Sequence, residues 1–200
     1  MVADLDSARR YSLTRLQTGL PRHYYYHSPS HTHDEVAPAA EELAALEGIT
    51  DEERLLLLTA AYFHDIGYVE QIDGHEAISV RIAGEVLPGM GYTPEHMHAI
   101  EKLILATRLP HAPGSHLEMV LVDADLDHLG RKEYWKRQDD LRRELAALGS
   151  PMADRAWYER QLHFMNEHRY FTESANRLWF DRKKRNITLI TRFLRRCEES

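Results

Sequence analysis

The sequence predicts an all-α protein, a compact bundle of about eight helices that form one domain over residues 1–200. Apolar residues recur at three- and four-residue intervals along most of the chain, which is the spacing of one face of an α-helix. No segment alternates apolar and polar residues as a half-buried strand does. A chain of 200 residues, 43% of them hydrophobic, is long enough to bury one core.

The first helix is expected over residues 31–46. Pro38 falls inside it, where a proline donates no backbone hydrogen bond and its ring clashes with the preceding turn. We therefore expect a kink near Pro38.

The second helix has clear start and stop signals. Thr50 and Glu53 form a capping-box pattern in front of the apolar run at residues 55–58. Gly67 favours a helix end just past Asp65. The neighbours His64 and Asp65 are therefore expected on the last turn of this helix.

The remaining helices follow from similar signals. Pro94 directly after Thr93 opens a helix that extends through Thr107, since proline at the first helical position loses no needed hydrogen bond. Ser115 and Glu118 repeat the capping-box pattern and start the helix that carries Asp123. The other segments with helical spacing are residues 74–87, 131–148, 153–169 and 172–197, separated by glycines and prolines.

Composition excludes several classes of function. The formal charge of −7, with no cluster of cations before the C-terminal segment, argues against general nucleic acid binding. The longest apolar run, residues 55–63, is far shorter than the ~20 residues of a membrane span, so no membrane insertion is expected. The N-terminal residues have no apolar stretch typical of a secretory signal. Because the single Cys197 cannot form an internal disulfide, we expect a cytoplasmic location.

Residues suited to hold a metal ion occur in three separate segments. His64 and Asp65 stand side by side in AAYFHDIGY, and they can share an ion that lies between their two directions near the helix end. His31 in YYYHSPSHTH and Asp123 in MVLVDADLDHLG are the natural suppliers of further ligands. Two imidazoles and two carboxylates without thiolate suit Mn, Fe, Zn, Ni or Co and disfavour Ca, with Mg as a further candidate.

The order of these segments resembles the HD-domain superfamily of metal-dependent phosphohydrolases. The resemblance is close over residues 24–131 and rests on five stretches in the expected order. They are YHSPSHT, LLLLTAAYFHDIGY, GHEAISVRIA, ILATRLP and DADLDHLGR. The resemblance implies an all-helical fold, with the helices of residues 132–200 packed on the HD core. It also implies one divalent ion and a metal-activated water that attacks phosphorus, with Asp65 to orient or deprotonate the water.

The resemblance also implies roles for the histidines near His31. It places the second histidine of YHSPSHT, His31, on the metal, whereas His27 lines the substrate pocket and His33 points elsewhere. Asp125 lies two residues from Asp123 and so on a different helix face. We expect Asp125 to be structural, as a partner of Arg131 or of a helix end.

Three further residues complete the expected site. His75 opens the segment GHEAIS and is expected to contact the substrate phosphate or to transfer a proton. Arg108 is expected to bind phosphate, because its planar guanidinium matches two phosphate oxygens. Thr107 stands where two-metal HD proteins would offer another histidine, so we expect one ion and place Thr107 among the substrate-binding residues.

The leading expectation is a phosphohydrolase for a small phosphoester, most naturally a nucleotide, as either a monoester or a cyclic diester. One alternative is an HD-type di-iron oxygenase, which needs about six metal ligands, whereas this chain offers four or five. Another is a nucleotide-binding regulatory HD protein with little turnover. The expected partners are a small-molecule substrate and a second copy of the chain in a homodimer.

Overall fold

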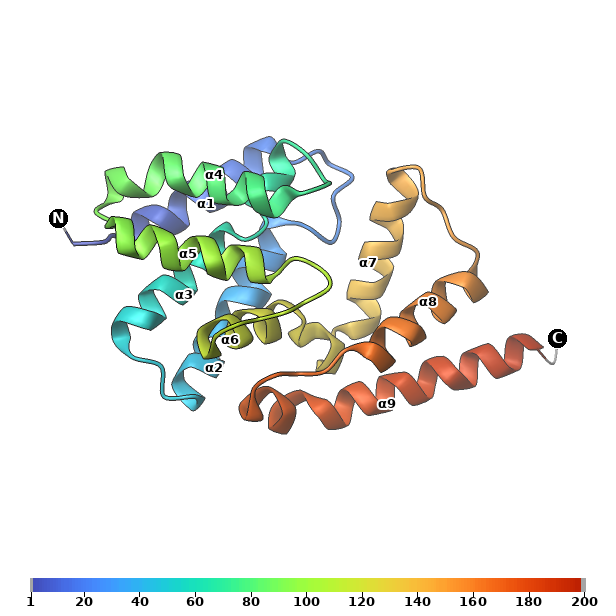
Figure 1. Ribbon diagram of the computed structural model, residues 1–200. Helices are drawn as coiled ribbons and strands as arrows, with labels where there is room; N and C mark the ends of the chain where they lie inside the picture. Colours follow the sequence, from blue (N-terminus) through green and yellow to red (C-terminus); the bar gives the residue numbers. More distant parts are fainter. Residues whose placement is uncertain (1, 199–200) are drawn as a thin grey trace.

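The computed structural model describes residues 2–198, and within that range all regular secondary structure is helical (Figure 1). The expectation of an all-α fold is therefore confirmed. The α-helices, in chain order, are α1 (Leu5–Gly19), α2 (Ala37–Leu46), α3 (Asp51–Phe63), α4 (His75–Val86), α5 (Pro94–Ala106), α6 (His116–Asp125), α7 (Tyr134–Ala147), α8 (Asp154–Glu167) and α9 (Glu173–Glu198). Short helical turns join them at η1 (His31–Val36), η2 (Ile66–Val69), η3 (Leu87–Met90) and η4 (Asp127–Gly130).

Helix α1 has no counterpart among the expected elements. Its start is well defined, because the Asp4 carboxylate accepts a hydrogen bond from the Ser7 backbone amide at 3.0 Å. The residues that α1 buries are Ala8, Ser12 and Leu16, four residues apart. Two of these three are small or polar, so the buried face leaves only a weak apolar pattern in the sequence.

The irregularity expected near Pro38 is present as a π-helical segment, η1, directly in front of α2. Pro38 stands in the first turn of α2, where its missing N–H costs no hydrogen bond. The wide turn before it removes the clash that a proline causes in a continuous α-helix. As a result His31 begins η1 rather than a regular α-helix.

His64 and Asp65 lie just past the last residue of α3, whereas the sequence predicts them on the last turn of that helix. The capping box of Thr50 and Glu53 is confirmed at the start of this helix. The helix ends at Phe63, so His64 is its C-cap and Asp65 begins the connection to η2. Gly67 then allows a close approach to α4, because a β-carbon there would lie 2.0 Å from the His75 carbonyl oxygen.

Of the two hydrogen bonds of the capping box expected at the start of α6, one is present, and the prediction of the other is wrong. The Ser115 side chain caps the helix by accepting a hydrogen bond from the Glu118 amide at 3.2 Å. The Glu118 carboxylate, however, accepts from the Gly114 amide at 2.6 Å instead of returning to Ser115. The helix start is therefore fixed by both side chains, but not by a reciprocal pair.

Two groups of buried apolar side chains organise the described residues. The larger group comes from the helices α1 through α6 and reaches Trp179 of α9. The smaller group lies among η4, α7, α8 and α9. Figure 1 shows α7, α8 and α9 together on one side of the molecule, beside the bundle that α1 to α6 form. No helix within residues 2–198 has the length and apolar character that a membrane span requires.

Candidate metal centre and substrate pocket

Four side chains place their ligand atoms around one point. His31 Nε2 lies 3.1 Å from Asp125 Oδ1 and 3.9 Å from Asp65 Oδ2. His64 Nε2 lies 3.2 Å from the same oxygen of Asp65 and 3.5 Å from Asp125 Oδ1. Neighbouring ligands of one ion lie about 3 Å apart when each metal–ligand bond is roughly 2.1 Å long. The ligand atoms of His31, His64 and Asp65 lie close enough together to hold a single divalent cation, and Asp125 Oδ1 lies beside both imidazoles.

Two of these atoms have no hydrogen-bond partner in the protein. They are His64 Nε2 and Asp65 Oδ2, both fully buried. The other ring nitrogen of His64 donates to the Ala61 carbonyl oxygen at 2.8 Å, which leaves the Nε2 lone pair facing the cluster. Because a buried polar atom without a partner costs about 1–3 kcal/mol, the pair fits a site completed by a cation.

The ring of His31 is held in place by residues behind it. Its Nδ1 lies 3.1 Å from Oε2 of Glu35, which stands four residues further along η1. The same oxygen lies 3.0 Å from Nε of the buried Arg137 of α7. Such a carboxylate behind a ligating imidazole fixes its orientation and makes the other nitrogen a better ligand.

The charges of the four groups depend on one another. Burial lowers the pKa of His31, but hydrogen bonds to Asp125 and Glu35 outweigh this and raise it to about 9. Burial likewise raises the pKa of Asp125, but hydrogen bonds from His31 and His64 bring it well below its ordinary value. The carboxylates therefore remain ionised, and they offer a strongly negative environment for a cation.

Asp65 has a second partner on its outer side. His75 Nε2 lies 3.4 Å from Asp65 Oδ1, and His75 Nδ1 donates to the Ile72 carbonyl oxygen at 3.1 Å. Burial lowers the pKa of His75, but the hydrogen bond to Asp65 and the nearby charges outweigh it and raise that pKa. One oxygen of Asp65 thus faces the cluster while the other faces the pocket wall.

The expected ligand Asp123 is not part of this cluster, and the assignment is corrected. Both of its oxygens are used by the segment before α9: the amides of Phe171 and Thr172 donate at 2.8–3.1 Å, and the Thr172 hydroxyl at 2.8 Å. Asp125, expected to be structural, occupies the place next to the two imidazoles. The expected contact with Arg131 belongs instead to Asp127.

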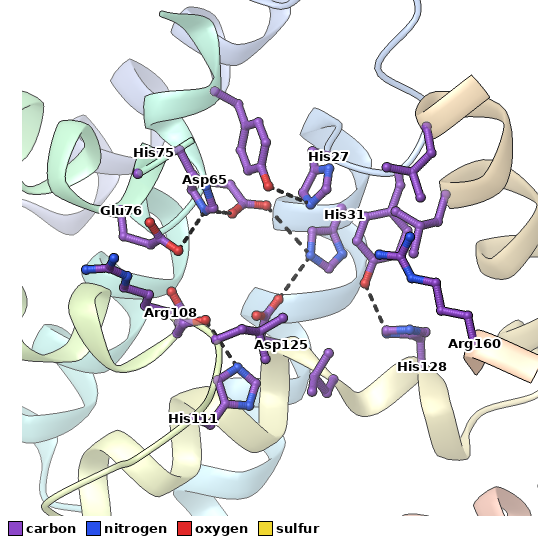
Figure 2. A pocket seen from close by; sticks show the side chains of 18 residues that line it. His27, His31, Asp65, His75, Glu76, Arg108, His111, Asp125, His128 and Arg160 are labelled. Atoms are coloured by element: carbon purple, nitrogen blue, oxygen red, sulfur yellow. Dashed lines mark hydrogen bonds and ion pairs between the residues drawn. The ribbon is translucent and has the colours of Figure 1, made fainter. Parts of the chain in front are cut away.

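Three members of the cluster, His31, Asp65 and Asp125, line a cavity of about 380 Å³ (Figure 2). His27, His75, Thr107 and Arg108 all line this cavity, as the sequence predicts, whereas the side chain of His33 is exposed elsewhere. Several lining residues have no counterpart in the sequence analysis. They are Tyr26, Tyr68, Glu76, His111, His128, Leu141, Leu145 and Arg160.

The cavity joins the two parts of the fold. Asp65, His75 and Arg108 reach it from the bundle of α1 to α6, whereas Leu141 of α7 and Arg160 of α8 close its other side (Figure 2). These helices lie far from the motif residues in the sequence, and their leucines and arginine carry no motif of their own. The sequence therefore indicates the cavity residues near the metal cluster, but not the residues of α7 and α8 that also line the cavity.

Comparison with known proteins shows the family and the fold of this chain. A family profile described as HD domain matches residues 32–197, most of the chain. The crystal structure of a predicted HD superfamily hydrolase from an uncultured Thermotogales bacterium is similar, with a TM-score of 0.64 and 21% identity over 94% of this chain and 91% of that one. A search of curated proteins finds no match. From the extent of the profile match, the chain belongs to the HD-domain family.

Proposed function

We propose that the protein is a metal-dependent phosphohydrolase that acts on a small phosphoester, with a nucleotide as the favoured substrate. The observation that carries the proposal is the cluster of two imidazoles and two carboxylates beside a cavity that also holds an arginine. A divalent ion held by these four residues would acidify a water molecule and offset the negative charge of a phosphoryl group. The family match and the similar predicted hydrolase support the same reaction class.

Each residue around the cluster has a separate role in this proposal. Asp65 accepts a hydrogen bond from the attacking water and orients it, since Asp65 belongs to the cluster and also lines the cavity. His75 holds Asp65 in that orientation and contacts the phosphate. Arg108, just past the end of α5, forms no ion pair with a carboxylate within residues 2–198 and is free to bind phosphate oxygens.

The cavity also supports a small substrate. Its volume of about 380 Å³ lies within the usual range for small-molecule sites, roughly 300–1,000 Å³. Leu126, Leu141 and Leu145 offer an apolar surface for the part of the substrate that does not react, and Arg160 adds a second cation. A nucleotide, as a monoester or a cyclic diester, combines an anionic group with such a flat, partly apolar body.

The test combines metal analysis with a substrate panel. The protein is treated with a chelator, its residual metal is measured, and Mn, Co, Ni or Zn is added back before assay on nucleoside monophosphates, cyclic nucleotides and aryl phosphates. We expect one equivalent of metal, no turnover without it, and recovery on reconstitution. Undiminished hydrolysis after complete metal removal would rule out the proposal.

The same experiment separates the two alternatives. Two equivalents of iron, one of them lost on His75→Ala, would indicate a di-iron oxygenase. Tight nucleotide binding without turnover by the metal-loaded protein would indicate a regulatory role. Both outcomes are distinct from the single exchangeable ion that a phosphohydrolase with this cluster requires.

A further inference from the structure

A chain of three polar side chains runs along the cavity wall, outside the metal cluster. It begins at Glu144 of α7, of which only 1% is exposed. The carboxylate accepts hydrogen bonds from the backbone amides of Tyr26 at 2.8 Å and His27 at 3.1 Å, and its other oxygen contacts Nδ1 of the His27 ring. Three contacts to one buried carboxylate fix both the position of His27 and the proton on its Nδ1.

The chain continues from His27 to Tyr68 of η2. The Tyr68 hydroxyl oxygen lies 3.0 Å from His27 Nε2. The Tyr68 ring is stacked between two imidazoles, with its centroid 4.1 Å from that of His27 and 3.9 Å from that of His75. His27, Tyr68 and His75 all line the cavity, and His75 contacts Asp65 of the cluster. The phenol is therefore held rigidly beside the place where a phosphoryl group would bind.

The surroundings of this chain keep Glu144 ionised and Tyr68 protonated. Burial raises the pKa of Glu144, but the hydrogen bonds from His27 and the backbone amides outweigh it, so the carboxylate is ionised. The carboxylate lies on Nδ1 of the His27 ring, and the Nε2 atom on the other side of the ring lies 3.0 Å from the Tyr68 oxygen, within reach of a proton transfer between them. Burial and the nearby carboxylates raise the pKa of Tyr68, so the phenol is protonated at neutral pH.

We propose that the Tyr68 hydroxyl is the general acid that protonates the leaving group, and that His27, held by Glu144, supplies the replacement proton. The inference rests on the proposed phosphohydrolase function and deepens it. As water attacks phosphorus, the bond to the ester oxygen breaks and its electron pair stays on that oxygen. The oxygen takes the Tyr68 proton, Tyr68 takes the Nε2 proton of His27, and solvent returns a proton to His27 after the alcohol leaves.

The other candidate donor on this wall is His75, which is less free for the task. Its Nδ1 donates a hydrogen bond to the Ile72 carbonyl oxygen, and its Nε2 faces Asp65. A proton given up by His75 would break the contact that orients Asp65. The Tyr68 hydroxyl has His27 Nε2 behind it at 3.0 Å, and that nitrogen does not belong to the cluster, so a proton can leave the hydroxyl without disturbing the ligands.

The test is the dependence of rate on the leaving group. The wild type and Tyr68→Phe are assayed on a series from 4-nitrophenyl phosphate, whose leaving group needs no proton, through phenyl phosphate to an alkyl phosphate. Phenylalanine keeps the stacked ring and removes only the hydroxyl. General acids contribute about 10²–10⁴-fold, so we expect kcat for phenyl and alkyl phosphate to fall by roughly a hundredfold or more. The rate for 4-nitrophenyl phosphate should fall by no more than about threefold.

Two further variants test the residues behind Tyr68. His27→Gln and Glu144→Gln should steepen the same dependence on the leaving group without removing the metal, because they interrupt the replacement of the proton. A purely structural role for either residue would lower all rates alike. His33→Gln is the matched control, since His33 is exposed a few residues along the chain and does not line the cavity.

The outcomes separate this inference from the function on which it rests. If the metal-loaded wild type hydrolyses neither these esters nor any nucleotide of the substrate panel, the proposed function and the inference both fall. If it does, but Tyr68→Phe with normal metal content and melting temperature loses the same factor on every ester, only the general acid role is wrong. A steeper dependence in His75→Ala and not in Tyr68→Phe would move that role to His75.

Discussion

Asp123 and Asp125 stand two residues apart on α6, are both carboxylates, and have opposite surroundings. Asp123 faces the segment before α9, where two amides and a hydroxyl donate to its oxygens. Asp125 faces His31 and His64, whose Nε2 atoms lie 3.1 Å and 3.5 Å from its Oδ1. Burial raises the pKa of Asp123 to about 6 despite its hydrogen bonds, whereas the two histidines hold the pKa of Asp125 well below its usual range.

The difference between these two carboxylates shows what makes a residue available to a metal. Protein donors already satisfy Asp123, so an ion there would have to displace hydrogen bonds that hold the chain together. Asp125 has partners that are themselves proposed metal ligands, and a cation would replace the protons that they share. Both residues are aspartates on the same helix. The direction in which each side chain points gives Asp123 a structural role and makes Asp125 available to a metal.

The largest expected effect is the loss of activity in Asp125→Ala. Without this ligand the cluster keeps three donors, and we expect phosphoester turnover to fall by at least about a thousandfold, or ~4 kcal/mol in transition-state stabilisation. Metal content is measured by elemental analysis and turnover on the best substrate of the panel. Asp123→Ala is the matched control on the same helix. If Asp125→Ala kept its full metal content and Asp123→Ala lost metal, Asp123 and not Asp125 would be the ligand.

Asp123→Ala should instead reduce stability. Its removal leaves the amides of Phe171 and Thr172 and the Thr172 hydroxyl without their acceptor, so the free energy of unfolding should fall by about 3 kcal/mol. For a chain of this length that corresponds to a drop of roughly 6–12 °C in melting temperature. Thermal unfolding of the metal-free proteins measures the effect. A melting temperature within a degree of the wild type would show that these hydrogen bonds are dispensable.

The fold was largely predictable because helix signals are local. Periodic apolar residues, the Thr50 cap and the glycine after Asp65 are all readable within a single turn or two of helix. Helix α1 was missed since its buried face carries Ala8 and Ser12 rather than large apolar residues.

The site was only partly predictable, because its details depend on contacts between distant segments. His64 and Asp65 are adjacent in sequence, so their joint role is visible. The choice between Asp123 and Asp125 depends on how α6 is rotated, and that is fixed by Thr172, which lies 49 residues beyond Asp123. The Glu144 contact that holds His27 spans 117 residues. No local pattern reports such partners.

Metal affinity should depend on pH through the histidines next to Asp125. The pKa of His31 is raised to about 9, above its ordinary 6.5, so without an ion this ring is protonated at neutral pH and must lose its proton to bind one. Each displaced proton weakens binding about tenfold per unit of falling pH, or roughly a hundredfold from pH 8 to pH 6. Calorimetry with Mn²⁺ in buffers of different ionisation enthalpy measures the protons released. Asp123→Asn should release the same number, and binding without proton release would contradict this account of the cluster.

Arg108→Ala should affect turnover without affecting either carboxylate. Loss of one charged hydrogen bond to phosphate costs about 1.5–3 kcal/mol, a ten- to hundredfold fall in kcat/KM. Metal content and melting temperature should remain those of the wild type, because Arg108 is exposed at the cavity and contacts neither Asp123 nor Asp125 among the described interactions. Lys102→Ala is the control, since Lys102 is an exposed cation on α5, the helix just before Arg108, and does not line the cavity. An equal loss in both variants would mean that general charge, and not a phosphate contact, is responsible.

The smallest expected effect concerns the charge of Asp123 itself. Its pKa of about 6 in the folded protein is above the 3.8 of an unperturbed aspartate, so the folded state binds a proton more readily than the unfolded state between these values. This contribution to stability is therefore largest at low pH and is lost as the pH rises through 6. Between pH 5 and pH 7 it amounts to about 1 kcal/mol. Asp123→Asn cannot titrate, so the free energy of unfolding of the wild type, measured relative to this variant, should fall by that amount over the same range. A difference that rises with pH would mean that the hydrogen bonds from Phe171 and Thr172 outweigh burial and hold Asp123 ionised, which would make the two carboxylates of α6 alike in charge and different only in their partners.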